Sequence, residues 1–167
     1  VAAANSTVTL DEDSAATELN ISAPTDPDTG DTLSIKVDSV PSGGEVRTAS
    51  GELLSAGSSL TINELTGLTF TPDENVNSDI DTVGTFSYTV SDQAGGRDSS
   101  TVSFTINAIQ DPPTIVSLMD FAIDENTTSV GTIIGEDPDG DMLTYSISGG
   151  ADSGLFQIDS STGEVSF

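Results

Sequence analysis

Apolar and polar residues alternate with a period of two along much of the chain. The alternation is clearest over residues 32–40, 82–92 and 99–109, where apolar side chains recur at every second position. Successive side chains of a β-strand point to opposite faces, so each of these stretches predicts a strand with one buried face. No stretch shows the period of a helix.

The last two of these stretches predict a hairpin, because the segment between them, residues 93–97, contains two glycines. One face of the hairpin is apolar and consists of Phe86, Tyr88, Val90, Val102, Phe104 and Ile106. We expect Tyr88 to lie in the core beside Phe104. The side chain of Lys36, in the opposite phase of its strand, is expected to point into solvent.

Shorter alternating runs at residues 7–10, 17–23 and 68–71 predict further strands. Between residues 45 and 68 the pattern weakens to apolar pairs separated by Gly and Ser, and we expect short strands there as well. Many short strands with frequent turn signals are typical of an antiparallel Greek-key β-sandwich. The expected fold class is therefore all-β, with antiparallel strands in two packed sheets.

Two consecutive prolines, Pro112 and Pro113, interrupt the alternation, and a new run begins at Ile115. Proline has no backbone N–H and fixes φ near −65°, so the pair predicts a stiff, extended connector and not a central strand. We interpret this segment as a joint. It divides the chain into a β-sandwich repeat at residues 1–110 and a second repeat at residues 111–167.

Two acidic motifs before the joint recur after it in the same order. Residues 10–14, Leu-Asp-Glu-Asp-Ser, are matched by residues 123–127, Ile-Asp-Glu-Asn-Thr. The Asp-Pro-Asp turn that begins at Asp26 is matched by the one that begins at Asp137. This order indicates an internal repeat of about 110 residues. Nothing in the second copy matches residues 82–109, so we expect it to be the N-terminal half of a truncated domain.

The charge and composition exclude several functions. The 28 acidic and three basic residues give a net charge of −25, which would repel nucleic acid and anionic membranes. The chain has no Cys and no His, so zinc fingers, thiol chemistry and Ser-His-Asp triads are excluded. The sequence also contains no apolar run long enough for a membrane span and no signal-peptide pattern.

The acidic turns have the chemistry of a calcium site. Carboxylates at alternate positions, such as Asp137, Asp139 and Asp141, can point to a common centre, where two charges about 4 Å apart repel by roughly 4 kcal/mol at an effective dielectric near 20. Calcium removes this repulsion and accepts oxygens in flexible geometry, whereas transition metals prefer His and Cys. A single turn of this kind is more often solvated surface. Its recurrence in register with an upstream Glu favours calcium.

The motif is not an EF-hand, because the sixth position from Asp137 is Met142 and the twelfth is Ser148. A Glu near the first strand, an Asp-Xaa-Asp turn and a polar linker before proline instead resemble the cadherin family and its bacterial relatives, the tandem repeats of large surface proteins. Residues 70–77 and 86–92 resemble the closing half of the bacterial version. Residues 156–165 resemble the middle of an animal-type repeat.

The resemblance implies three groups of calcium ligands. The joint ion would take Glu12 from the first domain, the linker residues Gln110 and Asp111, and Asp137, Asp139 and Asp141 from the second domain. Asp26, Asp28 and Asp31 would serve a preceding joint, and Glu125 a following one. The sequence departs from the family in having Gln110 where the linker usually has Asn, and in lacking an Asp-Arg-Glu segment, for which Asp73 or Glu74 could substitute.

These observations predict a non-catalytic calcium-binding module of a large extracellular adhesin or surface protein, with its secretion signal outside this sequence. Its partners would be calcium, neighbouring repeats, and a cell-surface protein or glycan. One alternative is a carbohydrate-binding accessory module of a secreted enzyme, which the absence of Trp and the inward phase of Tyr88 and Tyr145 disfavour. The other is a glycosidase with two carboxylates, but the acidic pairs lie in turns that calcium binding explains.

Overall fold

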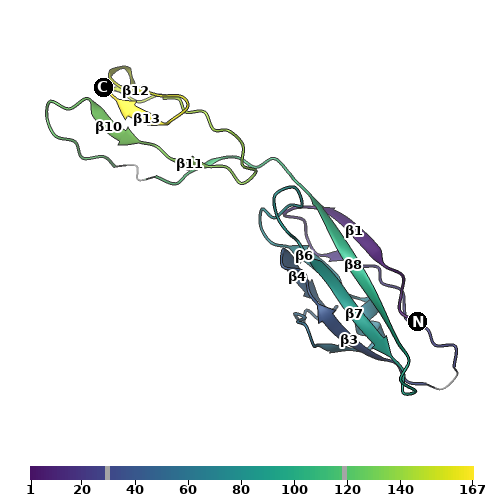
Figure 1. The fold of residues 1–167 in the computed structure, drawn as a ribbon. Coiled ribbons are helices and arrows are strands. Elements are labelled where there is room, and N and C mark those ends of the chain that lie inside the picture. The colour runs from purple at the N-terminus through teal and green to yellow at the C-terminus, as the bar shows by residue number, and fades with distance from the viewer. Residues whose placement is uncertain (29–30, 118–119) are drawn as a thin grey trace. The chain divides into compact units, whose positions relative to one another are not determined.

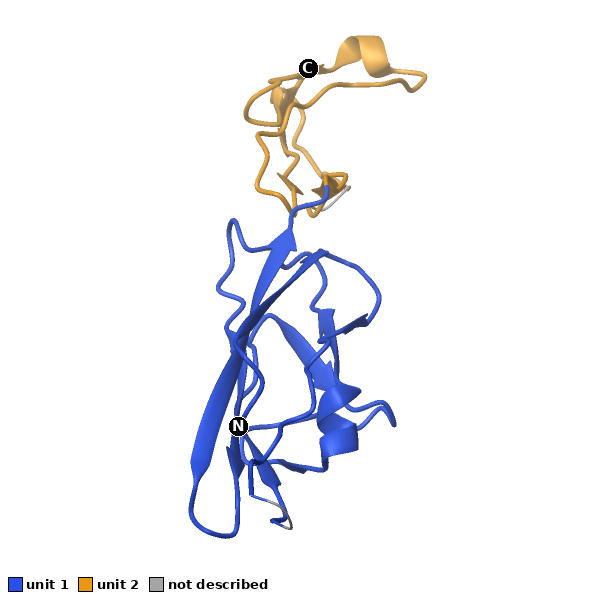
Figure 2. Ribbon diagram, turned by 90° about the vertical axis from the view of Figure 1, so that its right-hand side faces the viewer, with its two compact units in different colours: residues 1–109 blue, residues 110–167 orange. Residues whose placement is uncertain are grey.

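The computed structural model describes residues 1–28, 31–117 and 120–167. It divides into two compact units, residues 1–109 (unit 1) and residues 110–167 (unit 2), shown in Figure 2. The boundary predicted from the sequence, after residue 110, is one residue beyond the division between these units. Thr29 and Gly30, which lie between the predicted ligands Asp28 and Asp31, are outside the described residues. Within the described ranges, no helix is long and apolar enough to cross a membrane.

The larger sheet of unit 1 has the strand order β1-β8-β7-β3-β5 (Figure 1). Its strands are β1 (Ser6–Asp11), β3 (Ser34–Ser39), β5 (Ser59–Leu60), β7 (Thr85–Ser91) and β8 (Arg97–Asn107). The predicted hairpin is present, because β7 and β8 pair antiparallel with Tyr88 opposite Ser100. β1 runs parallel to β8, with Leu10 opposite Ile106, so one pair departs from the antiparallel arrangement.

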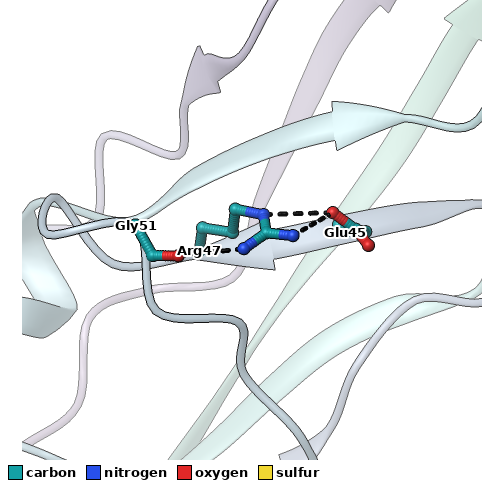
Figure 3. A network of polar contacts seen from close by, with 3 residues as sticks. All are labelled: Glu45, Arg47 and Gly51. Carbon is teal, nitrogen blue, oxygen red and sulfur yellow. Dashed lines mark hydrogen bonds and ion pairs between the residues drawn. The ribbon is translucent and has the colours of Figure 1, made fainter.

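The smaller sheet of unit 1 has the order β2-β6-β4. Its strands are β2 (Thr17–Glu18), β4 (Gly44–Arg47) and β6 (Thr69–Pro72). On β4 the Arg47 guanidinium donates to the Glu45 carboxylate at 2.7 and 3.0 Å and to the carbonyl of Gly51 at 2.9 Å (Figure 3). This is the one ion pair of the described residues, and its exposure limits its contribution to about 0–1 kcal/mol.

The inward faces of the two sheets meet in one hydrophobic core. Phe70 of β6 stacks on Phe104 of β8 with 4.1 Å between ring centroids, which joins the sheets. Tyr88 is fully buried in the same core, as predicted, but its ring neighbour is Phe86 at 6.0 Å and not the expected Phe104, which stacks on Phe70. Lys36 points into solvent as predicted. The all-β sandwich is therefore confirmed.

Residues 45–68 contain expected short strands, β5 and most of β4, but residues Ile62–Thr66 form a helix, α1, that the sequence pattern does not predict. The Thr61 hydroxyl accepts the N–H of Glu64 at 3.2 Å, and the Glu64 carboxylate accepts the N–H of Thr61 at 2.7 Å. The Thr61 hydroxyl also donates to this carboxylate at 2.8 Å, and the hydrogen bonds that the carboxylate accepts from the Thr61 backbone and side chain lower the pKa of Glu64. The pair is a capping box. A helix of five residues is too short to show a period, so its sequence signal is this Thr-Xaa-Xaa-Glu pair.

The strand predicted over residues 17–23 is limited to Thr17 and Glu18. The alternation beyond them reflects burial and not strand pairing. Leu19 and Ile21 are both buried in the core without belonging to a strand. Asn20 between them has a φ of 51°, which is outside the β region. Burial of alternate residues thus continues after the ladder has ended.

Unit 2 contains short strands around a thin apolar layer. They are β9 (Thr114–Ile115), β10 (Ser129–Thr132), β11 (Gly135–Glu136), β12 (Gln157–Ile158) and β13 (Glu164–Ser166), with a 3₁₀ turn, η1, at Ser153–Leu155. β10-β13-β12 form one sheet and β11-β9 another. Leu143, Tyr145, Phe156 and Ile158 are half-buried, and every fully buried apolar side chain of the described residues belongs to unit 1.

Candidate metal centres

Glu12, immediately after β1, is a buried carboxylate at one end of unit 1. Its side chain is only 3% exposed. Its N–H donates to the carbonyl of Asn107 at 3.0 Å and so extends the pairing of β1 with β8. Oε1 of Glu12 accepts the N–H of Ile109 at 2.6 Å, and Oε2 accepts the side-chain amide of Asn77 at 3.2 Å. The predicted ligand therefore holds the segment that leaves β8.

Asn77 is a site residue that the sequence analysis does not identify. It lies in the polar loop between β6 and β7 and is 2% exposed. Its sequence signal is weak, since an Asn in a polar loop is common. Only the fold brings it to its partner Glu12, which is 65 positions away in the chain. Asp13, next to Glu12, accepts the N–H of Asn75 at 3.0 Å. Two successive acidic residues thus bind this loop.

At the start of unit 2, the predicted linker and turn ligands lie together. The Gln110 side-chain amide donates to Oδ2 of Asp139 at 3.1 Å and to Oδ2 of Asp141 at 2.8 Å. The N–H of Asp111 donates to Oδ2 of Asp139 at 2.7 Å. Asp137 has a different role. Its Oδ1 accepts the N–H groups of Asp139 and Asp141 at 3.0 and 3.3 Å, and these hydrogen bonds stabilise the turn. The Gln110 amide thus bridges the carboxylates of Asp139 and Asp141.

A separate acidic cluster in unit 1 contains Asp26, Asp31 and Asp92, whose carboxylate oxygens lie within 4.8 Å of one another. Two of these residues are predicted ligands. Asp28 donates its N–H to Oδ1 of Asp26 at 2.8 Å and contributes no oxygen to the cluster. Asp92, just after β7, is absent from the predicted set. Its Oδ1 accepts the N–H of Gly96 at 2.7 Å across the hairpin.

Glu125 is exposed, unlike its repeat counterpart Glu12. The backbone of the two motifs is nevertheless alike, since the following residues, Asp13 and Asn126, have φ values of 56° and 66°. Non-glycine residues rarely adopt this left-handed conformation, and Asp and Asn do so most readily. The repeat seen in the sequence therefore extends to the turn geometry.

Neither tyrosine forms an exposed aromatic platform. Tyr88 is fully buried. Tyr145 is half-buried, and its hydroxyl accepts the N–H of Gly135 at 3.1 Å. Sugar-binding platforms usually stack a ring against the apolar face of a sugar, so this arrangement gives no support to the carbohydrate-binding alternative.

A family model, the bacterial Ig domain, matches residues 1–105. This match confirms the expectation of a bacterial Ig- or cadherin-like sandwich repeat for unit 1. No curated protein matches the chain.

Solved structures similar to the chain include Drosophila N-cadherin EC1-4, with 15% identity, 98% of this chain and 39% of that chain covered, and a TM-score of 0.46. Protocadherin Gamma B2 extracellular cadherin domains 3-6 has 19% identity, with 98% of this chain and 41% of that chain covered and a TM-score of 0.38. The chain thus spans about two fifths of the length of these structures.

Proposed function

The chain belongs to the bacterial Ig domain family, and from this premise we propose that it is a non-catalytic, calcium-binding module of a large extracellular adhesin or surface protein. Calcium at the joint between successive repeats would stiffen the array. The proposed partners are calcium itself, neighbouring repeats of the same protein, and a cell-surface protein or glycan bound elsewhere along the array.

One observation carries the proposal. Glu12 in unit 1 and Asp139 in unit 2, both predicted ligands, each accept a backbone N–H from the joint, that of Ile109 for Glu12 and that of Asp111 for Asp139. These two donors are only two positions apart in the chain. Each unit thus binds its own end of the short linker through the carboxylate of a predicted ligand.

The donor set fits calcium. Asp139 and Asp141 supply carboxylate oxygens, and rotation of the Gln110 amide would replace its NH₂ group by Oε1, so that a cation between the two carboxylates gains a further oxygen. Calcium takes six to eight oxygens in flexible geometry, whereas magnesium requires a near-ideal octahedron. The high negative charge of the chain adds a general attraction for cations.

The cluster of Asp26, Asp31 and Asp92 is the proposed position of a second ion. Its three carboxylate oxygens lie within reach of one cation, and Ala2 and Gly96 donate backbone N–H groups to the neighbouring carboxylates of Asp98 and Asp92. Asp92 would replace Asp28 in the ligand set inferred from the sequence.

A calcium titration followed by NMR tests the proposal, with the amides of Ile109 and Asp111 as local reporters. We expect both signals to shift with one midpoint of about 10⁻⁴ to 10⁻³ M, the range of extracellular calcium modules. Asp139→Ala should abolish the shift. The control is Asp152→Ala, which removes an exposed carboxylate that makes no capping hydrogen bond at η1. Unshifted signals in 10 mM calcium would disprove the proposal.

A further inference from the structure

The carboxylate of Glu12 is surrounded by neutral donors in the described part of the chain. Its hydrogen-bond donors are the N–H of Ile109 and the amide of Asn77, while the one ion pair joins Arg47 to Glu45 on β4. Burying a charge without a counter-charge is strongly unfavourable. The Glu12 side chain is 3% exposed, so a bound cation would supply the counter-charge that its surroundings lack.

The orientation of the Asn77 amide is fixed by its own loop. Oδ1 of Asn77 accepts the N–H of Asp79 at 3.2 Å, and the Asn77 carbonyl accepts the N–H of Asp81 at 3.0 Å. Because the amide oxygen is used by Asp79, the NH₂ group must face Glu12. With Asn77 only 2% exposed, water has little access to compete for this bond.

The loop itself is fastened to β8. Ser78 donates its N–H to the carbonyl of Ile106 at 2.9 Å, and its hydroxyl accepts the N–H of Ile106 at 2.8 Å. On the other side, Asn75 is bound by Asp13. The position of Asn77 relative to the ends of β1 and β8 is therefore set by protein contacts alone.

We infer that Asn77 is a positioning residue for the calcium ligand Glu12, an inference that rests on the proposed function. A carboxylate oxygen has two lone-pair directions. Ile109 uses one on Oε1 and Asn77 uses one on Oε2, which leaves one on each oxygen for an ion. Asn77 thus holds the carboxylate in one rotamer before the ion arrives, so that binding costs less side-chain entropy.

The test compares Asn77→Ala with Ser78→Ala in the same NMR calcium titration of the full chain. Loss of a partner that orients a metal ligand typically weakens metal affinity 10–100-fold, and we expect a loss of this size for Asn77→Ala. Ser78→Ala removes a hydrogen bond of the same loop without touching Glu12. It should lower the thermal midpoint and leave the calcium affinity unchanged.

If Asn77 has a purely structural role, Asn77→Ala should have a thermal midpoint that is lowered equally in EDTA and in calcium, and its calcium affinity should be unchanged. That result would overturn the inference but not the proposed function. If the wild-type chain binds no calcium, both fall.

Asn77→Ser is the second variant if Asn77→Ala does not fold. It keeps a hydroxyl in the loop but is too short to donate to Oε2 of Glu12, so its thermal midpoint should rise less with calcium than that of the wild type. An equal rise in the two proteins would contradict the positioning role.

Discussion

Single carboxylates in this chain have very different surroundings, and these decide what each can do. Glu12 is buried under Asn77 and the segment that leaves β8, whereas Glu125, at the matching position of the repeat, is exposed. The residues that follow them, Asp13 and Asn126, both have a left-handed φ. The two carboxylates differ in exposure because, in unit 1, the loop between β6 and β7 packs against Glu12 through Asn77.

The buried ring of Tyr88 gives the first prediction at the residue scale. Because Tyr88 is fully buried against Phe86, Tyr88→Ala should lower the free energy of unfolding of unit 1 by about 3–5 kcal/mol, the usual cost of deleting a large buried aromatic side chain. Urea denaturation measures this. Tyr145→Ala in unit 2 is the control and should leave the stability of unit 1 unchanged. A loss below about 1 kcal/mol for Tyr88→Ala would indicate an exposed ring.

Asp159 provides a prediction about pH. Its Oδ1 accepts hydrogen bonds from the hydroxyl and N–H of Ser161 and from the N–H of Thr162, and these lower its pKa from 3.8 to about 2. A lowered pKa in the folded state stabilises the turn above pH 3.8, and this contribution is lost as the pH falls toward 2. NMR titration of the carboxyl carbon should give the low value, and Ser161→Ala should raise it. A midpoint near 4 in the wild type would show that these bonds do not form.

At the scale of elements, the strong alternation of β3, β7 and β8 makes them predictable from sequence, because each has one face in the core and one in solvent. α1 is not predictable by period, since its signal is a cap. Asp92 and Asn77 are found only through the fold, which brings Asp92 to Asp26 and Asn77 to Glu12. Sequence patterns report the burial of local faces, whereas a ligand set depends on contacts between distant segments.

The pairing of β4 with β6 leads to a prediction about Gly44. A Cβ at this position would lie 2.4 Å from the carbonyl oxygen of Thr71 and 2.6 Å from the ring of Phe70, so the strand has no room for a side chain. Gly44→Ala should therefore destabilise unit 1 by about 1–3 kcal/mol, as overpacking does. The control is Gly149→Ala, where an added Cβ meets nothing within 4 Å. Equal thermal midpoints for the two variants would contradict this account of the sheet.

For the molecule as a whole, the two units differ in how much apolar surface they cover. Unit 1 contains every fully buried apolar side chain of the described residues, and nine of the 13 exposed large apolar side chains belong to unit 2, namely Ile115, Val116, Phe121, Ile123, Ile134, Met142, Ile147, Leu155 and Phe167. Exposed apolar surface and unpaired strand edges favour association. That unit 2 is half of a repeat remains a prediction.

Residues 110–167 expressed alone should accordingly be mobile or associate. We expect a dye that binds exposed apolar surface to fluoresce strongly with this piece, and thermal unfolding without a cooperative transition. Residues 1–109 are the control and should unfold cooperatively. Cooperative unfolding of a monomeric 110–167 fragment would contradict this expectation.

Calcium should also fix the arrangement of the two units, and this is the central claim. The proposed ligands come from three separate segments, represented by Glu12, Asp111 and Asp139. At a calcium concentration ten times the dissociation constant, binding would contribute roughly 1.4 kcal/mol per site to the ordered joint. Without the ion that would link these segments, the joint should be mobile.

The most direct test is the distance distribution between spin labels in the two units. The chain has no cysteine, so Ala56→Cys and Ser148→Cys, both at exposed positions, place one label in each unit without background. We predict a broad distribution in EDTA and a narrow one in millimolar calcium, with Asp111→Ala remaining broad in both. Wild-type distributions that superimpose with and without calcium would contradict the account and return the acidic turns to ordinary solvated surface.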